Sequence, residues 1–217
     1  MRKKNVLMIF LSVMIGFTFM SFKDKVHGKI VCFGDSITHG AKVDGHSWVW
    51  YFQQANYPGV TFINEGRSGR KTADKKELLP VLQKYSNADY YLIFLGVNDL
   101  KDGNEVMVDS CIENMQWMVD KIERVDAKAK IVILAPSDIN LKTMSAVNVA
   151  KKYNENTRKS LISLEKKYQA LAKKDHLGFI SLLHTVSKPN YADGLHPNLK
   201  GQQQIEAAVW KGLNKLY

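Results

Sequence analysis

The chain alternates short apolar segments, rich in β-branched residues, with longer amphipathic segments. The short segments span residues 29–33, 60–64, 90–95, 130–135 and 178–182. Their successive residues are apolar rather than alternately apolar and polar, which is typical of parallel strands covered by helices on both faces. The longer segments span about residues 45–56, 73–86, 105–125, 145–174 and 198–215. This alternation predicts an α/β fold, a three-layer α/β/α sandwich around a five-stranded, mainly parallel sheet.

The fourth amphipathic segment, 145–174, is the longest of these. Apolar and small residues recur there at steps of three and four, the spacing of a single helix face. They are Val147, Ala150, Tyr153, Thr157, Leu161, Leu164, Tyr168 and Leu171. We expect one continuous helix whose stripe packs on the core, and this packing accounts for the stripe without any functional role.

Residues 1–22 differ in character from the rest of the chain. A basic segment, MRKKN, precedes a continuous apolar run at residues 6–22. This order is typical of an export signal, so we predict an exported protein, periplasmic or secreted, from which the signal is cleaved. An uncleaved membrane anchor is the alternative, since the run is nearly long enough to span a bilayer. We expect residues 28–217 to form a single domain, without stable membrane insertion after cleavage.

The net charge argues against one class of partner. The formal charge is +10, and without Arg2, Lys3 and Lys4 it is +7, from 28 basic and 21 acidic residues. Much of this charge lies in lysine pairs scattered along the predicted helices, as on solvated helix faces. No basic tract is interleaved with aromatic residues, as a nucleic-acid groove would need. The sequence therefore predicts no nucleic-acid partner.

The two cysteines indicate neither a metal site nor a disulfide framework. Cys32 lies in an apolar strand segment and Cys111 in a helical one, so we expect two buried thiols. A disulfide between them is the alternative in an oxidising compartment. The chain has no CxxC motif and no paired Cys/His spacing, which argues against a structural zinc site.

Polar residues follow four of the five predicted strands. The first strand ends at Gly34-Asp35-Ser36, the second runs into NEGRSG at 64–69, and the third into GVND at 96–99. The fifth is followed by YADGLHPNLKG, which holds Asp193 and His196 ahead of the last helix. The fourth is followed by PSDINLKTM, which contains no motif that indicates a function. Ligands in such folds bind beyond the carboxyl ends of the strands, so the four polar loops predict one shared site.

In order and spacing, these blocks resemble the SGNH, or GDSL, hydrolase family. GDSIT resembles the nucleophile block, NEGRSG the glycine block, GVND the asparagine block and DGLHPN the Asp-x-x-His block. The resemblance runs from about Lys29 to the C-terminus, and it implies the SGNH hydrolase fold with its flavodoxin-like sheet. The α/β-hydrolase class fits less well, because Thr38 stands where the second glycine of a G-x-S-x-G elbow would fall.

The resemblance also implies a role for each site residue. Ser36 would be the nucleophile, His196 the general base, and Asp193 the carboxylate that orients and stabilises the imidazole. The backbone N–H groups of Ser36 and Gly69 and the side-chain amide of Asn98 would form the oxyanion hole. This scheme includes no metal ion and no organic cofactor.

Three polar neighbours of these residues have simpler interpretations. We expect Asp35 to brace the Ser36 turn through backbone N–H groups, and Asp99 to cap or stabilise its own loop. Arg67 has two interpretations, one as a contact for an anionic substrate and the other as a brace for its loop.

The sequence therefore predicts an exported serine esterase that acts through an acyl-enzyme. The expected substrates are small-molecule or carbohydrate-linked O-acyl esters, as for an O-acetyl esterase, because the loops are compact and no long apolar insertion could form a lid. A lysophospholipase or thioesterase of the same family is one alternative. A non-catalytic carbohydrate-binding protein built on this scaffold is another.

Overall fold

The computed structural model describes residues 26–217, so the predicted export signal or anchor at residues 1–22 lies outside the described residues. Five parallel strands form one sheet in the order β2-β1-β3-β4-β5, which confirms the predicted fold class. The strands are β1 (Gly28–Gly34), β2 (Val60–Gly66), β3 (Tyr90–Phe94), β4 (Lys130–Ala135) and β5 (Gly178–Ser181). The order reverses at β1, between β2 and β3, and this switch point is where such sheets open a crevice for ligands.

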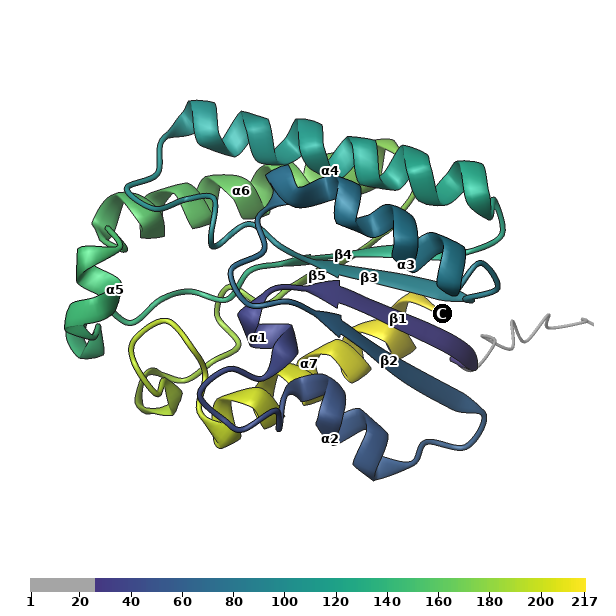
Figure 1. The fold of residues 1–217 in the computed structure, drawn as a ribbon, viewed down its shortest axis with the longest axis horizontal. Coiled ribbons are helices and arrows are strands. Elements are labelled where there is room, and N and C mark those ends of the chain that lie inside the picture. The colour runs from purple at the N-terminus through teal and green to yellow at the C-terminus, as the bar shows by residue number, and fades with distance from the viewer. Residues whose placement is uncertain (1–25) are drawn as a thin grey trace, which may run out of the picture.

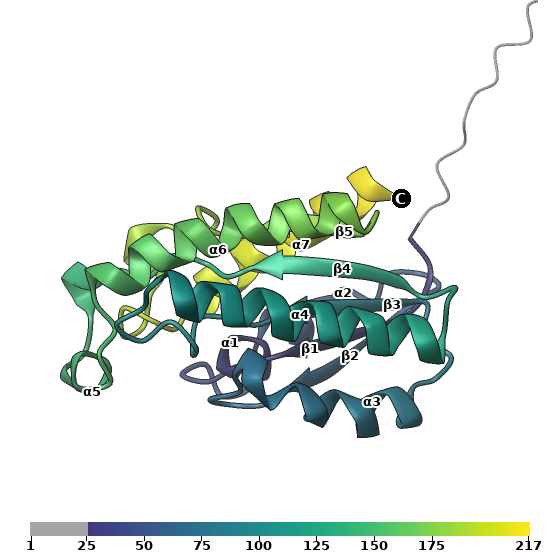
Figure 2. The same ribbon diagram turned by 90° about the horizontal axis from the view of Figure 1, so that it is seen from above.

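Helices cover both faces of the sheet (Figures 1 and 2). One face carries α3 (Leu78–Lys84), α4 (Glu105–Val125) and α6 (Glu155–Lys174). The other carries α1 (Ser36–His39), α2 (Trp48–Ala55) and α7 (Leu199–Leu216). Shorter elements in the connections are η1 (Thr72–Glu77), η2 (Leu141–Thr143), α5 (Ala146–Ala150) and η3 (Lys188–Asn190). No helix within residues 26–217 is long and apolar enough to cross a membrane.

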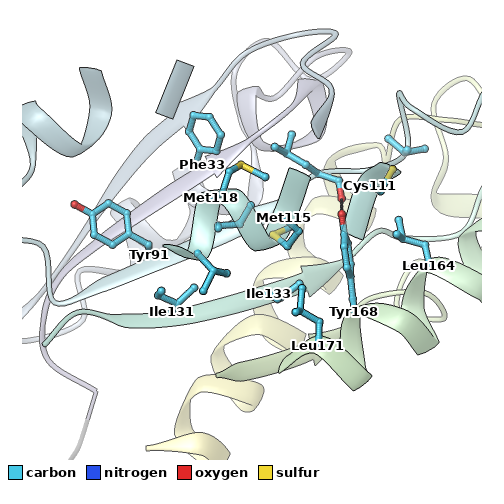
Figure 3. Close-up of a cluster of buried hydrophobic side chains, with 14 of the residues drawn as sticks. Phe33, Tyr91, Cys111, Met115, Met118, Ile131, Ile133, Leu164, Tyr168 and Leu171 are labelled. Carbon is cyan, nitrogen blue, oxygen red and sulfur yellow. Dashed lines mark hydrogen bonds between the residues drawn. The ribbon is translucent and has the colours of Figure 1, made fainter. Parts of the chain in front are cut away.

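Each strand contributes side chains to two cores, and this explains its unbroken apolar sequence. In β1, Val31 and Phe33 pack with α3, α4 and α6, while Ile30 and Cys32 pack with α2 and α7. Figure 3 shows the first of these cores, where Phe33 lies among side chains from neighbouring strands and helices. Cys32 and Cys111 belong to different cores on opposite faces of the sheet, and both are free thiols, so no disulfide joins them.

The prediction of one helix over 145–174 is wrong. The structure has two helices, α5 and α6, separated by a turn in which Lys152 adopts a left-handed φ of 65°. The side chain of Asn154 accepts the N–H groups of Asn156 and Thr157 and so starts α6 as a new helix. Val147, expected in the core, is 63% exposed, whereas the stripe is buried from Tyr153 onward. The segment 73–86 is likewise divided, into η1 and α3.

Candidate active site

Ser36 lies at the carboxyl end of β1, where the sheet order reverses. The Oδ1 atom of Asp35 accepts the N–H of Ile37 at 2.9 Å and caps the short helix α1, as predicted for a brace of this turn. A Cβ atom on Gly34 would lie 2.1 Å from Oγ1 of the buried Thr38, so the chain can turn this tightly only with glycine there. The turn holds Ser36 almost buried, with 7% of its surface exposed.

The loop before α7 brings Asp193 and His196 to this serine. The Nε2 atom of His196 lies 3.0 Å from Oγ of Ser36, across 160 residues of sequence. The Nδ1 atom lies 2.9 Å from Oδ2 of Asp193. A carboxylate can only accept a hydrogen bond, so in the neutral imidazole Nδ1 carries the proton and Nε2 is left to accept one from Ser36.

Backbone contacts fix the shape of this loop. The Oδ1 atom of Asp193 accepts the N–H of Leu195 at 3.1 Å and that of His196 at 2.8 Å. Gly194 has φ of +81°, and a Cβ there would lie 2.5 Å from Cα of Met144. The contacts of the Asp193 carboxylate are therefore set by local chain geometry as well as by the ring.

The pKa values of the two carboxyl groups of the site are shifted in opposite directions, although burial raises both. Burial alone would raise the pKa of Asp193, but the hydrogen bonds from the ring and backbone of His196 hold that pKa well below its usual range. For Asp35, burial is the larger influence and raises the pKa to about 6, against the lowering effect of the Ile37 N–H. Asp193 thus stays ionised beside the imidazole at neutral pH.

Asn98 follows β3 and lies beside the carboxyl group of Asp35. Its Nδ2 atom donates to the carbonyl of Arg70 at 3.2 Å and lies 3.4 Å from Oδ2 of Asp35. Its Oδ1 atom accepts the hydroxyl of Tyr153 at 2.8 Å. Asn98 is 5% exposed, so its amide is held within the protein rather than in solvent.

Gly69 directly precedes Arg70, and the carbonyl of Arg70 accepts a hydrogen bond from Asn98. Gly69 is therefore connected to the site through Arg70. Gly69 is exposed and has φ of +80°. A Cβ at this position would meet no atom within 4 Å, so the left-handed backbone, and not crowding by the protein, is what favours glycine there.

Two polar residues have the supporting roles that the sequence suggested. Asp99 accepts both the N–H and the hydroxyl of Thr72, so it has a structural role, but it joins its loop to η1 rather than bracing its own loop alone. Arg67 forms ion pairs with Asp74 and Glu77 at 2.8 and 2.7 Å, which supports the interpretation of this residue as a brace.

Arg70 is a buried residue of the site that the sequence analysis missed. Its guanidinium lies 4.0 Å from the centroid of the Phe33 ring and donates to the carbonyl of Gly34 at 2.6 Å and to that of Glu65 at 2.5 Å. Nε of Arg70 also binds Glu77 at 3.0 Å. Arg70 therefore fastens together the carboxyl ends of β1 and β2, from which the Ser36 and Gly69 loops emerge.

The loop after β4 also supports the site, although its sequence showed no motif. The backbone N–H of Asn140 donates to the carbonyl of Gly194 at 2.7 Å, and its side chain donates to the carbonyl of Lys188 at 2.8 Å. Asp138 in the same loop forms an ion pair with Arg158 of α6. The backbone contact of Asn140 therefore holds the loop of Asp193 and His196, while the ion pair of Asp138 ties the loop after β4 to α6.

The described part of the chain has no group of three or more His, Cys, Asp or Glu side chains that could hold a metal ion. The site brings together a hydroxyl in contact with an imidazole, a carboxylate on the other ring nitrogen, and an amide and backbone N–H groups nearby.

Solved structures with similar folds include several esterases. An aryl esterase from M. smegmatis matches with a TM-score of 0.72 and 22% identity, over 88% of this chain and 100% of that one. A carbohydrate acetylesterase family member from Sinorhizobium meliloti matches with a TM-score of 0.71 and 18% identity, over 87% and 98%. An acetylxylan esterase from Geobacillus stearothermophilus, a catalytic mutant, matches with a TM-score of 0.67 and 18% identity, over 87% and 96%. At these identities the likeness shows a shared fold.

A comparison with curated proteins found no significant match. The model of the GDSL-like Lipase/Acylhydrolase family matches residues 32–204, which include every block of the candidate site. This match extends over most of the chain and agrees with the fold of the esterases above. The chain therefore belongs to the GDSL-like lipase/acylhydrolase family of carboxylic ester hydrolases.

Proposed function

We propose that the protein is a serine esterase that cleaves O-acyl esters through an acyl-enzyme on Ser36. The observation that carries the proposal is the pair of contacts made by His196, with Nε2 3.0 Å from Oγ of Ser36 and Nδ1 2.9 Å from Asp193. A general base must lie within hydrogen-bond reach of the proton it removes, and this geometry meets that condition.

In the first half of the reaction, Oγ of Ser36 attacks the ester carbonyl carbon while Nε2 of His196 takes its proton. The bond from the carbonyl carbon to the alcohol oxygen then breaks, and His196 gives that proton to the departing alcohol. In the second half, His196 deprotonates a water that attacks the acyl carbon. Ser36 leaves with the proton, and the carboxylic acid is released.

The negative oxygen formed in each half needs nearby N–H donors. We assign this role to the backbone N–H groups of Ser36 and Gly69 and to Nδ2 of Asn98. Asn98 suits the role because an amide is a neutral donor that cannot compete with His196 for a proton. Removing one donor of this kind typically costs ~10²–10³ in turnover.

We propose small or carbohydrate-linked O-acyl esters as substrates. Gly69 and His39, in the loops that hold the site, are exposed, which supports the approach of a bulky alcohol such as a sugar. Two solved structures that share the fold are a carbohydrate acetylesterase family member and an acetylxylan esterase, which supports this choice. We also propose export, on the basic and apolar pattern of residues 1–22.

The test is turnover of a graded series of p-nitrophenyl esters, from acetate to laurate, together with acetylated xylan. The proposal predicts hydrolysis of acetate and short acyl esters and release of acetate from xylan, with no turnover by Ser36→Ala. A preference for long acyl chains would instead favour a lysophospholipase or thioesterase. Failure of the folded wild-type protein to cleave any ester would favour the non-catalytic binding protein and contradict the proposal.

A further inference from the structure

An asparagine can serve an oxyanion only if its NH₂ group, and not its carbonyl oxygen, faces the reacting ester. The two ends of the carboxamide have nearly the same shape, so packing alone does not distinguish them. Rotation of the Asn98 amide by half a turn would present Oδ1 to the developing negative charge and repel it. What holds Asn98 in one orientation therefore bears directly on catalysis.

Acceptors lie at one end of this amide and a hydroxyl at the other. The carbonyl of Arg70 and the carboxyl of Asp35 face Nδ2, at 3.2 and 3.4 Å. The hydroxyl of Tyr153 donates to Oδ1 at 2.8 Å, which makes it the shortest of the three contacts. The acceptors favour the orientation seen here, and the hydroxyl satisfies a buried oxygen that would otherwise lose its partner.

Tyr153 reaches Asn98 because α5 and α6 do not form one helix. It lies in the turn between them, 55 residues from Asn98 in sequence, with 3% of its surface exposed. The backbone N–H of Tyr153 donates to the carbonyl of Asn148, and Asn154 caps α6 directly after it. Burial raises the pKa of Tyr153 well above its usual range, so the phenol keeps its proton and remains a donor.

We propose that Tyr153 is a positioning residue for the oxyanion hole. Its hydroxyl holds Oδ1 of Asn98 and, by polarising the amide, makes the N–H groups at the other end stronger donors. The inference rests on the proposed function, because it needs Asn98 to bind the oxyanion. Since the negative charge develops only in the transition state, Tyr153 should affect kcat and leave KM unchanged.

The first test is Tyr153→Phe, which removes the hydroxyl and keeps the ring. We expect kcat for p-nitrophenyl acetate to fall about tenfold, less than for loss of a donor itself, with KM unchanged. The matched control is Tyr91→Phe, which also removes a buried hydroxyl, one that donates to the carbonyl of Tyr85 at 2.7 Å. Tyr91 lies near the amino end of β3, whereas Asn98 follows the carboxyl end of that strand, so this control should keep the wild-type kcat.

The second test asks whether Tyr153 acts through Asn98. In an Asn98→Ala background, Tyr153→Phe should change kcat by less than about twofold, because the group it positions is already gone. A tenfold loss that persists in this background would overturn the inference. An unchanged kcat for Tyr153→Phe in an active protein would also overturn it and leave the esterase proposal intact. A wild-type protein inactive on every ester would instead contradict the proposed function.

A third variant keeps the inference testable if Tyr153→Phe does not fold. Incorporation of 3-fluorotyrosine at position 153 retains the ring and gives a more acidic hydroxyl, which is a stronger hydrogen-bond donor. We expect kcat at or above the wild-type value for this protein. A tenfold fall in kcat in the folded fluorotyrosine protein would contradict the role of the hydroxyl.

Discussion

The Asp193→Asn substitution exchanges a single atom at the centre of the site. In the structure, Oδ1 of Asp193 accepts two backbone N–H groups, those of Leu195 and His196, and lies 3.1 Å from Nδ1 of the His196 ring, while Oδ2 lies nearer to Nδ1, at 2.9 Å. An amide nitrogen cannot accept those backbone donors, so the asparagine keeps its oxygen there and turns its NH₂ group toward the ring. The NH₂ group then stands at the position nearer to Nδ1 and donates to it, so the proton of the ring moves to Nε2, the atom that faces Ser36.

An imidazole with its proton on Nε2 cannot take the proton of Ser36. Holding the base in the wrong tautomer costs about 10⁴ in kcat in serine hydrolases that use this arrangement, and we expect a loss of that size here. On the free-energy scale this corresponds to about 5.5 kcal/mol in the activation barrier. The substitution hardly changes side-chain volume, so the packing around the loop should be preserved.

Stability gives a second readout for the same variant. The folded-state pKa of Asp193 is depressed, so its stabilising contribution is present above the unfolded-state pKa, near 3.9, and is lost as pH falls through the folded-state value. Asp193→Asn lacks this contribution. We therefore expect the wild-type protein to have a larger free energy of unfolding than Asp193→Asn at neutral pH. This difference between the two proteins should narrow on acidification below about pH 4.

The assay is steady-state hydrolysis of p-nitrophenyl acetate, with urea unfolding of each protein as the check on folding. Asp109→Asn serves as the control, because this carboxylate lies on α4 with 61% of its side chain exposed and should leave kcat unchanged. A loss of less than about tenfold in folded Asp193→Asn would refute the assigned tautomer and, with it, the orienting role of Asp193.

Two further predictions concern the pair of Ser36 and His196 and the carboxyl group of Asp35, which precedes Ser36 in the chain. Ser36→Ala and His196→Ala should each abolish ester turnover, and the double variant should be little worse because the pair acts as a unit; losses that multiply would contradict this. Burial raises the pKa of Asp35 to about 6, so the free energy of unfolding of the wild-type protein should fall as pH rises from about 4 to 6. Asp35→Asn has no such group to ionise. In urea titrations, its free energy of unfolding relative to that of wild type should therefore rise by about 2 kcal/mol between about pH 4.5 and 7.5. A difference that stays constant with pH would show that this carboxyl is not desolvated.

The sheet could be predicted because burial on both faces leaves a clear mark on the sequence. The five apolar runs correspond to the five observed strands, and their alternation with amphipathic segments required a parallel arrangement. The break between α5 and α6 was missed because Val147 and Ala150 continue the helical spacing by chance, although both are exposed. The capping side chain of Asn154 is a local signal that could have revealed the break.

The loops of the candidate site were located from sequence because short polar motifs follow predicted strands. The residues that support them were not, because their partners are set by tertiary packing. Tyr153 fitted the core stripe, and its hydroxyl bond to Asn98 spans 55 residues. Arg70 stands just after the NEGRSG block and belongs to no motif, although only 5% of it is exposed and it joins the ends of two strands. A sequence pattern carries no information on such contacts between distant segments.

The central claim, that His196 activates Ser36 as a nucleophile, is tested most directly by a fluorophosphonate probe followed by peptide mass spectrometry. An activated serine oxygen displaces fluoride from phosphorus and keeps the phosphonyl group. We predict a single adduct on Ser36 of the folded wild-type protein, and none on His196→Ala. No adduct, an adduct on another residue, or equal labelling of the His196→Ala variant would contradict the account.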